Sequence, residues 1–476
     1  MLTYTKEELR SPSGKEKEWI LTNGLGGYAS STLSSLNTRK YHGLLISALN
    51  PPTQRYLQLS KIEEEITFPK AHYSLGYNKY PNIYHPEGYK HLLSFTKTAN
   101  VTSIYSLPEL HLEKTISLPR NTNATLISYK ILSKKEATLL LKPFITCRSI
   151  HELKHHNQLS FKQQANSKTT VLKTSQTGLP ILLLGTNHAH YKKEEFWINT
   201  LEYEEEQARG YDYQEDLFVP GTFIFPIKKG LNKLTLLAAG GRHKEAYTTF
   251  NNLYNNRSQD LLLAQEETRI NNIIQETYHF NNLKKDPLIH HLAQAADSFL
   301  VKRTSTNTII AGYPWFTDWG RDALISLPGL CLVTGRIQEA QSILTFFAKH
   351  LRKGLVPNFF SETNESSYQA VDTSLWFIHA VYKFIQHTNN YTFVHNELWP
   401  TMKNIITHYI HGTDNTIFMD KDHLLSSGDA STALTWMDAK IENTPASINI
   451  TFFMAIDSYR CKHSRTASIS IILEVR

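Results

Sequence analysis

The spacing of hydrophobic and polar positions changes near the middle of the chain. Up to about residue 255, short apolar runs alternate with clusters of turn-forming residues. Residues 127–131 alternate apolar and polar, 138–144 are more continuously apolar, and the Pro/Asn cluster 119–123 separates two such runs. Short runs bounded in this way are typical of antiparallel strands. The pattern therefore predicts a large β-sandwich in residues 1–255.

The second half follows the spacing of amphipathic helices. Asp286 can cap a helix whose first position is Pro287, and Gly354 is expected to end a later helix. Four apolar stripes at steps of three and four residues predict the buried faces. They are Leu288, Leu292, Ala295 and Phe299; Ile337, Ala340, Leu344, Phe347 and Leu351; Val371, Leu375, Ile378, Tyr382 and Ile385; and Leu398, Met402, Ile405 and Tyr409. Helices joined by polar loops predict a partial α/α toroid over 286–476, after a charged helical linker at 256–285.

Composition limits the class of protein. The 476 residues are 41% hydrophobic, enough for two or three domains with substantial cores. The net charge is +7, but Lys and Arg are scattered, so we expect no nucleic-acid partner. No apolar run approaches the ~20 residues of a membrane-spanning helix, and residues 1–8 carry acidic groups where a signal peptide is apolar. These features predict a cytoplasmic protein with no membrane partner.

The cysteine pattern gives no sign of a metal site. Cys147, Cys331 and Cys461 are few, odd in number and widely separated. Such a set fits a reducing compartment and argues against both a disulfide framework and a zinc site. The Gly-x-Gly-Gly sequence at 24–27 lacks the residues of a phosphate-binding loop, so a tight turn is the better interpretation. We expect neither a metal nor an organic cofactor.

The strongest chemical pattern is the octapeptide 315–322, Trp-Phe-Thr-Asp-Trp-Gly-Arg-Asp. It combines three aromatic rings, two carboxylates and a guanidinium. Rings stack on sugar faces, carboxylates supply protons or bind hydroxyls, and Arg forms forked hydrogen bonds. Each group also has a structural interpretation, since Trp and Phe pack in cores and Asp pairs with Arg on surfaces. The pattern alone leaves both interpretations open.

Further motifs accompany this octapeptide in a fixed order along the chain. They are 18–30, 38–45, 210–218, 310–336, 371–377 and 434–440. Together they resemble the bacterial and archaeal glycogen debranching enzymes, the amylo-alpha-1,6-glucosidases, over nearly all of residues 18–440. The resemblance implies a β-sandwich followed by a six-hairpin catalytic domain. It also implies an inverting, cofactor-independent hydrolase that removes alpha-1,6-linked glucose from branch points of glycogen or limit dextrin.

The same resemblance implies that Asp322 is the general acid that protonates the glycosidic oxygen. Without it, a helix N-cap would be an equally good account of Asp322. On a helix, Asp318 would share a face with Asp322, with Cβ atoms about 5 to 6 Å apart. An inverting pair needs roughly 6.5 to 9.5 Å to admit the attacking water. We therefore expect Asp318 to bind hydroxyls and the base to come from elsewhere.

The remaining site residues are expected to bind substrate. Asp372, Asp438 and Glu442 are candidates for the base, but each has an alternative role, and we rank Asp372 and Asp438 as ligands of sugar hydroxyls. Four tryptophans would form stacking walls, with core packing as an equal alternative for each. The predicted substrate-binding set is Trp315, Asp318, Trp319, Arg321, Asp372, Trp376, Trp436 and Asp438.

The end of the chain departs from the family pattern. The resemblance fades after Lys440, and it places the general base in the later portion. We therefore expect a C-terminally truncated or frameshifted chain whose helices expose apolar faces. Two alternatives follow for function. One is a catalytically inactive glycan-binding remnant without the base, and the other is a sugar phosphorylase of the same architecture, which would require phosphate.

Overall fold

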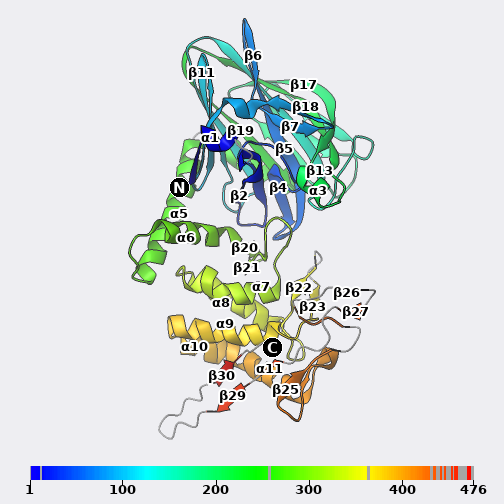
Figure 1. The fold of residues 1–476 in the computed structure, drawn as a ribbon, viewed down its shortest axis with the longest axis vertical. Helices are drawn as coiled ribbons and strands as arrows, with labels where there is room; N and C mark the ends of the chain where they lie inside the picture. Colours follow the sequence, from blue (N-terminus) through cyan, green and yellow to red (C-terminus); the bar gives the residue numbers. More distant parts are fainter. Residues whose placement is uncertain are drawn as a thin grey trace. The chain divides into compact units, whose positions relative to one another are not determined.

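The computed structural model describes residues 2–10, 13–255, 259–361, 365–428 and 432–435, together with the backbone of short strands between 440 and 472. The chain divides into two compact units. The first contains Met1–Gln275 and Lys285–Arg303, and the second contains Glu276–Lys284 and Thr304–Arg476. The first is rich in strands and the second in helices, as Figure 1 shows by colour from blue to red. This confirms the predicted combination of a β-sandwich with a helical domain.

Two antiparallel sheets build the first unit. One sheet has the order β1 (Leu2–Thr5), β9 (Leu92–Lys97), β10 (Val101–Leu107), β11 (Leu110–Ser117), β12 (Ala124–Ser133), β19 (Gly230–Gly241), β16 (Ile181–Gly185), β15 (Thr169–Thr174) and β14 (Phe161–Ala165). The other has the order β17 (His190–Glu202), β18 (Gln214–Ile227), β13 (Ala137–Ser149), β5 (Thr53–Phe68), β4 (Gly43–Asn50), β3 (Tyr28–Thr32) and β2 (Glu18–Thr22), with β6 (Ala71–Ser74) paired to β5. A separate hairpin joins β7 (Tyr77–Tyr80) to β8 (Ile83–Glu87).

Short helices complete this unit. They are α1 (Lys6–Arg10), α2 (Ser13–Glu16), the 3-10 turn η1 (Gly88–His91), α3 (Glu204–Ala208) and α4 (His243–Tyr254). Helix α4 packs with Phe250 and Leu253 against β16 and β19. It thereby buries part of the outer face of the nine-stranded sheet.

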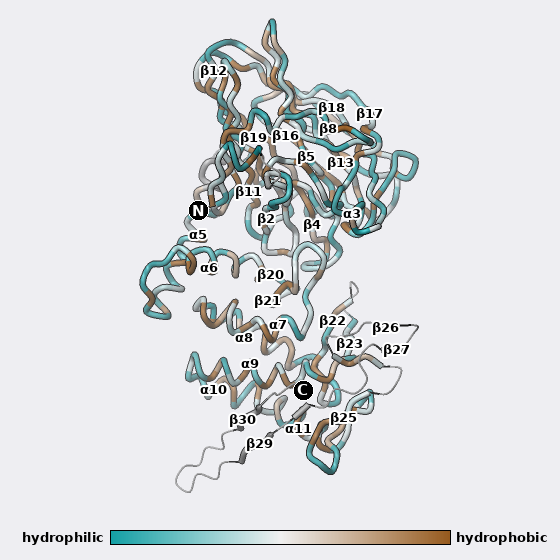
Figure 2. Tube along the Cα trace, viewed as in Figure 1, coloured by the Kyte–Doolittle hydropathy of each residue, from teal (hydrophilic) through white to brown (hydrophobic). Residues whose placement is uncertain are grey.

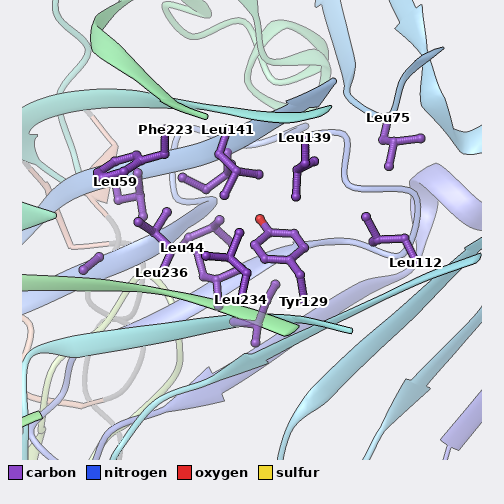
Figure 3. Close-up of a cluster of buried hydrophobic side chains, with 14 of the residues drawn as sticks. Leu44, Leu59, Leu75, Leu112, Tyr129, Leu139, Leu141, Phe223, Leu234 and Leu236 are labelled. Carbon is purple, nitrogen blue, oxygen red and sulfur yellow. The ribbon is translucent and has the colours of Figure 1, made fainter. Parts of the chain in front are cut away.

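The main core lies between the two sheets. In β12 the buried Ile127, Tyr129 and Ile131 alternate with the more accessible Ser128 and Lys130, which confirms the predicted alternation. Figure 3 shows how the two layers meet: side chains of β12 and β19 face those of β4, β5, β13 and β18. Among the labelled residues, the eight-stranded sheet contributes Leu44, Leu59, Leu139, Leu141 and Phe223. The nine-stranded sheet contributes Tyr129, Leu234 and Leu236. Each fully buried side chain of this size contributes about 1.5 to 3 kcal/mol to the free energy of folding.

A sealed ion pair connects several segments of the sandwich. Arg148 of β13 donates two hydrogen bonds to Glu215 of β18, at 2.5 and 2.9 Å, and neither side chain is exposed. The hydroxyl of Tyr203 donates to the same carboxylate at 2.6 Å. Arg148 also donates to the carbonyl of Lys40, at 2.8 Å, which holds the loop before β4. These hydrogen bonds therefore hold strands β13 and β18 and the loop before β4 together.

Helices α5 (Gln259–Phe280) and α6 (Pro287–Phe299) follow the sandwich, and α6 leads into β20 (Leu300–Arg303). The carboxylate of Asp286 accepts from the backbone N–H of Leu288 at 2.7 Å, which confirms the predicted cap. The predicted buried face is wrong, because Leu288 and Leu292 are 65% and 59% exposed. The buried face instead contains Ala293, Ala296 and Asp297.

Ion pairs explain the orientation of α6. The carboxylate of Asp297 pairs with Arg269 of α5 at 2.6 Å and with Arg120 at 3.4 Å. The side of α6 that carries Asp297 therefore faces Arg269 and Arg120, and the two leucines lie on an exposed side. The hydrophobic pattern set the start of the helical domain at residue 286, whereas residues 285–303 group with the sandwich by their contacts.

The second unit is built mainly from helices. They are α7 (Gly320–Leu327), the π-turn η2 (Pro328–Leu332), α8 (Ile337–Lys349), α9 (Thr373–Thr388), α10 (Tyr391–Phe393), the π-turn η3 (Val394–Leu398), α11 (Trp399–His411) and the 3-10 turn η4 (Asp414–Thr416). Short strands are β21 (Thr306–Ile309), β22 (Phe359–Phe360), β23 (Ser366–Ser367), β24 (Phe418–Met419) and β25 (Leu424–Ser426). Farther along lie β26 (Lys440–Ile441), β27 (Thr444–Pro445), β28 (Phe452–Phe453), β29 (Ala455–Ser458) and β30 (Ile469–Ile472). Helix α9 packs against both α7 and α8.

The predicted helical stripes agree with most of the buried positions. Figure 2 shows apolar and polar residues alternating along α8 and α9. In α11, Met402, Ile405 and Tyr409 are buried as predicted. Two corrections apply: α8 ends at Lys349, before Gly354, and Tyr382 of α9 is exposed. Helix α9 has neighbours on two sides, so its buried surface is broader than one stripe and also includes Phe377, Val381 and Phe384. In the described parts of the chain, no helix combines the length and apolar character needed to cross a membrane.

Candidate active site

The first part of the octapeptide forms a closed loop before α7. Asp318 pairs with Ile310 as an antiparallel bridge, and the N–H of Ala311 donates to the carbonyl of Thr317 at 2.8 Å. Asp318 is 2% exposed, and its carboxylate accepts from the hydroxyl of Thr308 in β21 at 3.0 Å. The expectation that Asp318 and Asp322 share a helix face is therefore wrong, because the helix begins only at Gly320. In this structure the carboxylate of Asp318 holds the loop.

The first residue of α7, Gly320, lies very close to the segment around Asn358. The N–H of Gly320 donates to the carbonyl of Asn358 at 2.8 Å, and Trp319 forms an antiparallel bridge with Phe359. A Cβ atom at Gly320 would lie 2.1 Å from the carbonyl oxygen of Pro357, a distance that no side chain could tolerate. Glycine is thus required at this position by contact with the neighbouring strand segment.

Arg321 and Asp372 form a forked ion pair. Nε of Arg321 donates to Oδ2 of Asp372 at 2.6 Å, and the second nitrogen donates to Oδ1 at 2.7 Å. Asp372 is the buried N-cap residue of α9, so the pair joins the starts of α7 and α9. We predicted that both residues bind substrate. The structure brings them together and shows that both carboxylate oxygens of Asp372 accept from Arg321.

Asp322 lies in the first turn of α7 and is accessible to solvent. The N-cap position belongs to Trp319, so the alternative account of Asp322 as the helix cap is wrong. Protein atoms around the carboxyl displace part of its hydrating water, and this raises its pKa. The backbone N–H of Asp322 itself and the charge of Arg321 act in the opposite direction, while the charge of Asp372 adds to the increase. The net result is a carboxyl that holds its proton to a higher pH than an ordinary aspartate.

The aromatic residues of the octapeptide differ in accessibility. Trp315 and Phe316 are exposed on the loop, with 36% and 52% of their surfaces accessible. Trp319 is partly buried and packs on Phe359, with ring centroids 4.9 Å apart. Trp376 of α9 is partly buried as well. Trp315 and Phe316 therefore offer more accessible surface than Trp319.

The two later candidates, Trp436 and Asp438, lie outside the described residues, as does Glu442. The nearest described segment ends at Thr435. Within it, the carbonyl of Leu434 accepts from the N–H of Val371 at 2.9 Å. The chain just before Trp436 is therefore fixed next to the residue that precedes Asp372. Among the described residues, no group of three or more His, Cys, Asp or Glu side chains could hold a metal ion.

Asn358 and Thr373 are site residues that the sequence analysis missed. Oδ1 of Asn358 accepts from the N–H of Arg321 and from the hydroxyl of Thr373, each at 3.1 Å. Asn358 lies 37 positions from Arg321 in the chain. Its only sequence signal is the preceding Pro357, which marks turns in general and indicates no partner. Only the fold shows that its side chain meets two helix starts.

Comparisons with known proteins identify the family of this chain. The family model described as "Glycogen debranching enzyme N terminal" matches residues 17–234, and the model described as "Amylo-alpha-1,6-glucosidase" matches residues 294–448. A glycogen debranching enzyme of Saccharomyces cerevisiae is 39% identical over 83 residues, which cover 16% of this chain and 5% of the yeast protein.

Two solved structures match much of the chain at low sequence identity. A putative kojibiose phosphorylase from the human microbiome has a TM-score of 0.49 at 10% identity, covering 88% of this chain and 59% of that protein. A bacterial glucoamylase in complex with acarbose has a TM-score of 0.45 at 14% identity, covering 84% and 57%. In each of these three comparisons the chain spans less than two thirds of the matched protein. Because two models of one family match in order and together span most of residues 17–448, this chain belongs to the glycogen debranching enzyme family.

Proposed function

We propose that this chain is a glycoside hydrolase that removes alpha-1,6-linked glucose at branch points of glycogen or limit dextrin, with Asp322 as the general acid. The observation that carries the proposal is the environment of Asp322. Its carboxyl is accessible to a substrate, and its pKa is raised chiefly by loss of hydration. A general acid needs this combination, because it must still hold a proton when the glycosidic bond breaks. Membership of the debranching family supports the choice of substrate.

The paired charges beside Asp322 support the same role. An unpaired arginine next to a carboxyl would favour its ionised form and weaken it as an acid. Here the guanidinium of Arg321 is directed to Asp372, which supplies a compensating negative charge. The pair thus limits the effect of Arg321 on the pKa of Asp322.

The proposed reaction is hydrolysis with acid assistance. Asp322 donates its proton to the glycosidic oxygen while the bond to the glucose carbon breaks, and water attacks that carbon from the opposite face. The water passes its proton to a general base, which the family resemblance places beyond Lys440. We assign no residue to the base. The exposed rings of Trp315 and Phe316 are the proposed stacking surface for the sugar.

Glucose release from limit dextrin, measured without phosphate, tests this proposal. The wild-type chain is compared with Asp322→Asn, which keeps the size of the side chain but carries no acidic proton. Glu339→Gln is the matched control, because Glu339 is also an acidic residue in the first helical turn of the same unit but lies on α8. Release that is lost in Asp322→Asn and retained in Glu339→Gln supports the proposal. Equal release by wild type and Asp322→Asn would exclude Asp322 as the acid.

The inactive-remnant alternative makes a different prediction for the same proteins. A remnant would release no glucose, yet its retardation in a glycogen-containing native gel would be the same for wild type and Asp322→Asn. A requirement for added phosphate would instead indicate a phosphorylase. A branched alpha-glucan as the binding partner and a cytoplasmic location remain predictions within this proposal.

A further inference from the structure

Three donors from two helix starts converge on Asn358. Its side-chain oxygen accepts from the N–H of Arg321 and from the hydroxyl of Thr373, each at 3.1 Å. Its backbone carbonyl accepts from the N–H of Gly320 at 2.8 Å. Asn358 is 7% exposed and Thr373 is fully buried, so water cannot readily replace these bonds. One residue therefore connects the first turn of α7 to the first turn of α9.

The residues that Asn358 holds are direct neighbours of the charged groups. Arg321 precedes Asp322 in α7, and Thr373 follows Asp372 at the start of α9. The amide oxygen of Asn358 thus fixes both the backbone of Arg321 and the start of α9, next to Asp372. The forked geometry of the Arg321–Asp372 pair depends on the spacing of these two helix starts.

We propose that Asn358 is a positioning residue that sets the direction of the Asp322 carboxyl by locking the start of α7 against the start of α9. The inference rests on the proposed role of Asp322 as the general acid. Asn358 itself has no contact with the reacting atoms in this scheme. It acts through the backbone of Gly320 and Arg321, which determines where the side chain of the next residue points.

A purely structural role for Asn358 would have a different consequence. Loss of a stabilising buried amide lowers the free energy of unfolding but leaves the environment of Asp322 unchanged in the folded protein. Loss of a positioning contact loosens the first turn of α7 and lets more water surround the carboxyl of Asp322. Among the described residues, the charged groups that act on Asp322 are Arg321 on its own helix and Asp372 at the start of α9. Since lost hydration is the main cause of the raised pKa, loosening should lower it.

The test uses three variants of the whole chain. Asn358→Ala removes the side-chain acceptor, and Thr373→Val removes one donor while keeping the shape of the residue. Asn358→Asp keeps acceptor oxygens in the same place and serves as the rescue of activity, while its added negative charge should raise the pKa of Asp322. The matched control is Ser374→Ala, because Ser374 is an equally buried hydroxyl residue in the same helical turn. Its bonds go to Gly354 and Val356 and not to α7.

Two readouts separate positioning from stability. The pKa of Asp322 is measured by NMR titration of carboxyl-labelled aspartate, with the signal assigned by its absence in Asp322→Asn. The rate of glucose release gives kcat and KM. For Asn358→Ala we expect a lower pKa of Asp322 and a fall in kcat of up to about 10²-fold, the cost typical of a misplaced catalytic group, with KM little changed. Thr373→Val should shift both values in the same direction, and Asn358→Asp should restore most of the activity.

An unchanged pKa of Asp322 in folded Asn358→Ala, with a loss of stability like that of Ser374→Ala, would overturn the inference. If Asn358→Ala does not fold, Thr373→Val decides the same question. Failure of the proposed function is recognised separately. It would appear as a wild-type chain without glucose release, whereas the titration of Asp322 still reports whether Asn358 positions it.

Discussion

Two arginine–carboxylate pairs in this molecule have the same chemistry but different surroundings. Arg148 and Glu215 in the sandwich and Arg321 and Asp372 in the helical unit both form forked bonds of 2.5 to 2.9 Å. The first pair is fully buried, and Tyr203 and the carbonyl of Lys40 complete its hydrogen bonds. The second pair adjoins the accessible carboxyl of Asp322.

The comparison teaches that the same pair of charges has a different effect when a titratable group lies beside it. Burial alone would lower the pKa of Arg148, but the adjoining Glu215 outweighs this effect and raises it. Arg148 is therefore permanently charged and its bonds hold strands and a loop together. The Arg321–Asp372 pair uses the same bonds beside Asp322, the group proposed to donate a proton.

The largest expected effect is on catalysis by the accessible group. Asp322→Asn should lower kcat by about 10²- to 10⁴-fold, the usual contribution of a general acid, because the amide has no proton to donate. Initial rates of glucose release measure this change. Circular dichroism checks that the variant is folded, and a folded variant with wild-type kcat would contradict the assignment.

The next largest effect is on the stability of the sandwich. Glu215→Gln leaves Arg148 buried without a charged partner, so the free energy of unfolding should fall by about 3 to 5 kcal/mol. Urea denaturation followed by tryptophan fluorescence measures this loss. Glu109→Gln provides the control, since its pair with Lys135 is exposed and screened by water, so its loss should change the unfolding midpoint little. Equal midpoints for the two variants would show that the sealed pair is not a structural support.

A smaller effect should distinguish the second pair from the first. Asp372→Asn removes the negative charge that raises the pKa of Asp322 and leaves Arg321, which lowers it, without its counter-ion. The pKa of Asp322 should therefore fall, and the alkaline limb of the kcat profile should move to lower pH. Loss of a charged hydrogen-bond partner should also reduce kcat by roughly tenfold or more. A shift of the alkaline limb to higher pH would contradict the arrangement.

The smallest expected effect is a pH-dependent change in melting temperature. The pKa of Asp322 is raised in the folded state, so ionisation destabilises the fold as pH rises through that pKa. Asp322→Asn cannot ionise and should melt slightly higher than wild type at pH 7, with little difference at pH 4. Calorimetry at both pH values measures the difference. Glu339→Gln should show no such trend if the effect belongs to Asp322.

Several features of the fold could be predicted because they depend on neighbours in the sequence. The alternation in 127–131 predicted the inward-facing residues of β12, such as Tyr129. Asp286 with Pro287 marked the start of α6. The apolar stripe of α11 was also correct. Local rules failed where a distant partner decided the outcome. The leucines of α6 are exposed because Asp297 of the same helix pairs with Arg120 and Arg269.

The sequence by itself determined the classes of secondary structure, the two-part organisation and the octapeptide that contains Asp322. These follow from hydrophobic period, capping residues and motif spacing, which are local properties of the chain. Only the tertiary structure decided that Arg321 pairs with Asp372, 51 positions away, and that Asn358 connects their helices. It also buried Asp318 in a loop that lies outside the helix. Such pairings depend on which segments the folded core brings together, and no local pattern encodes that choice.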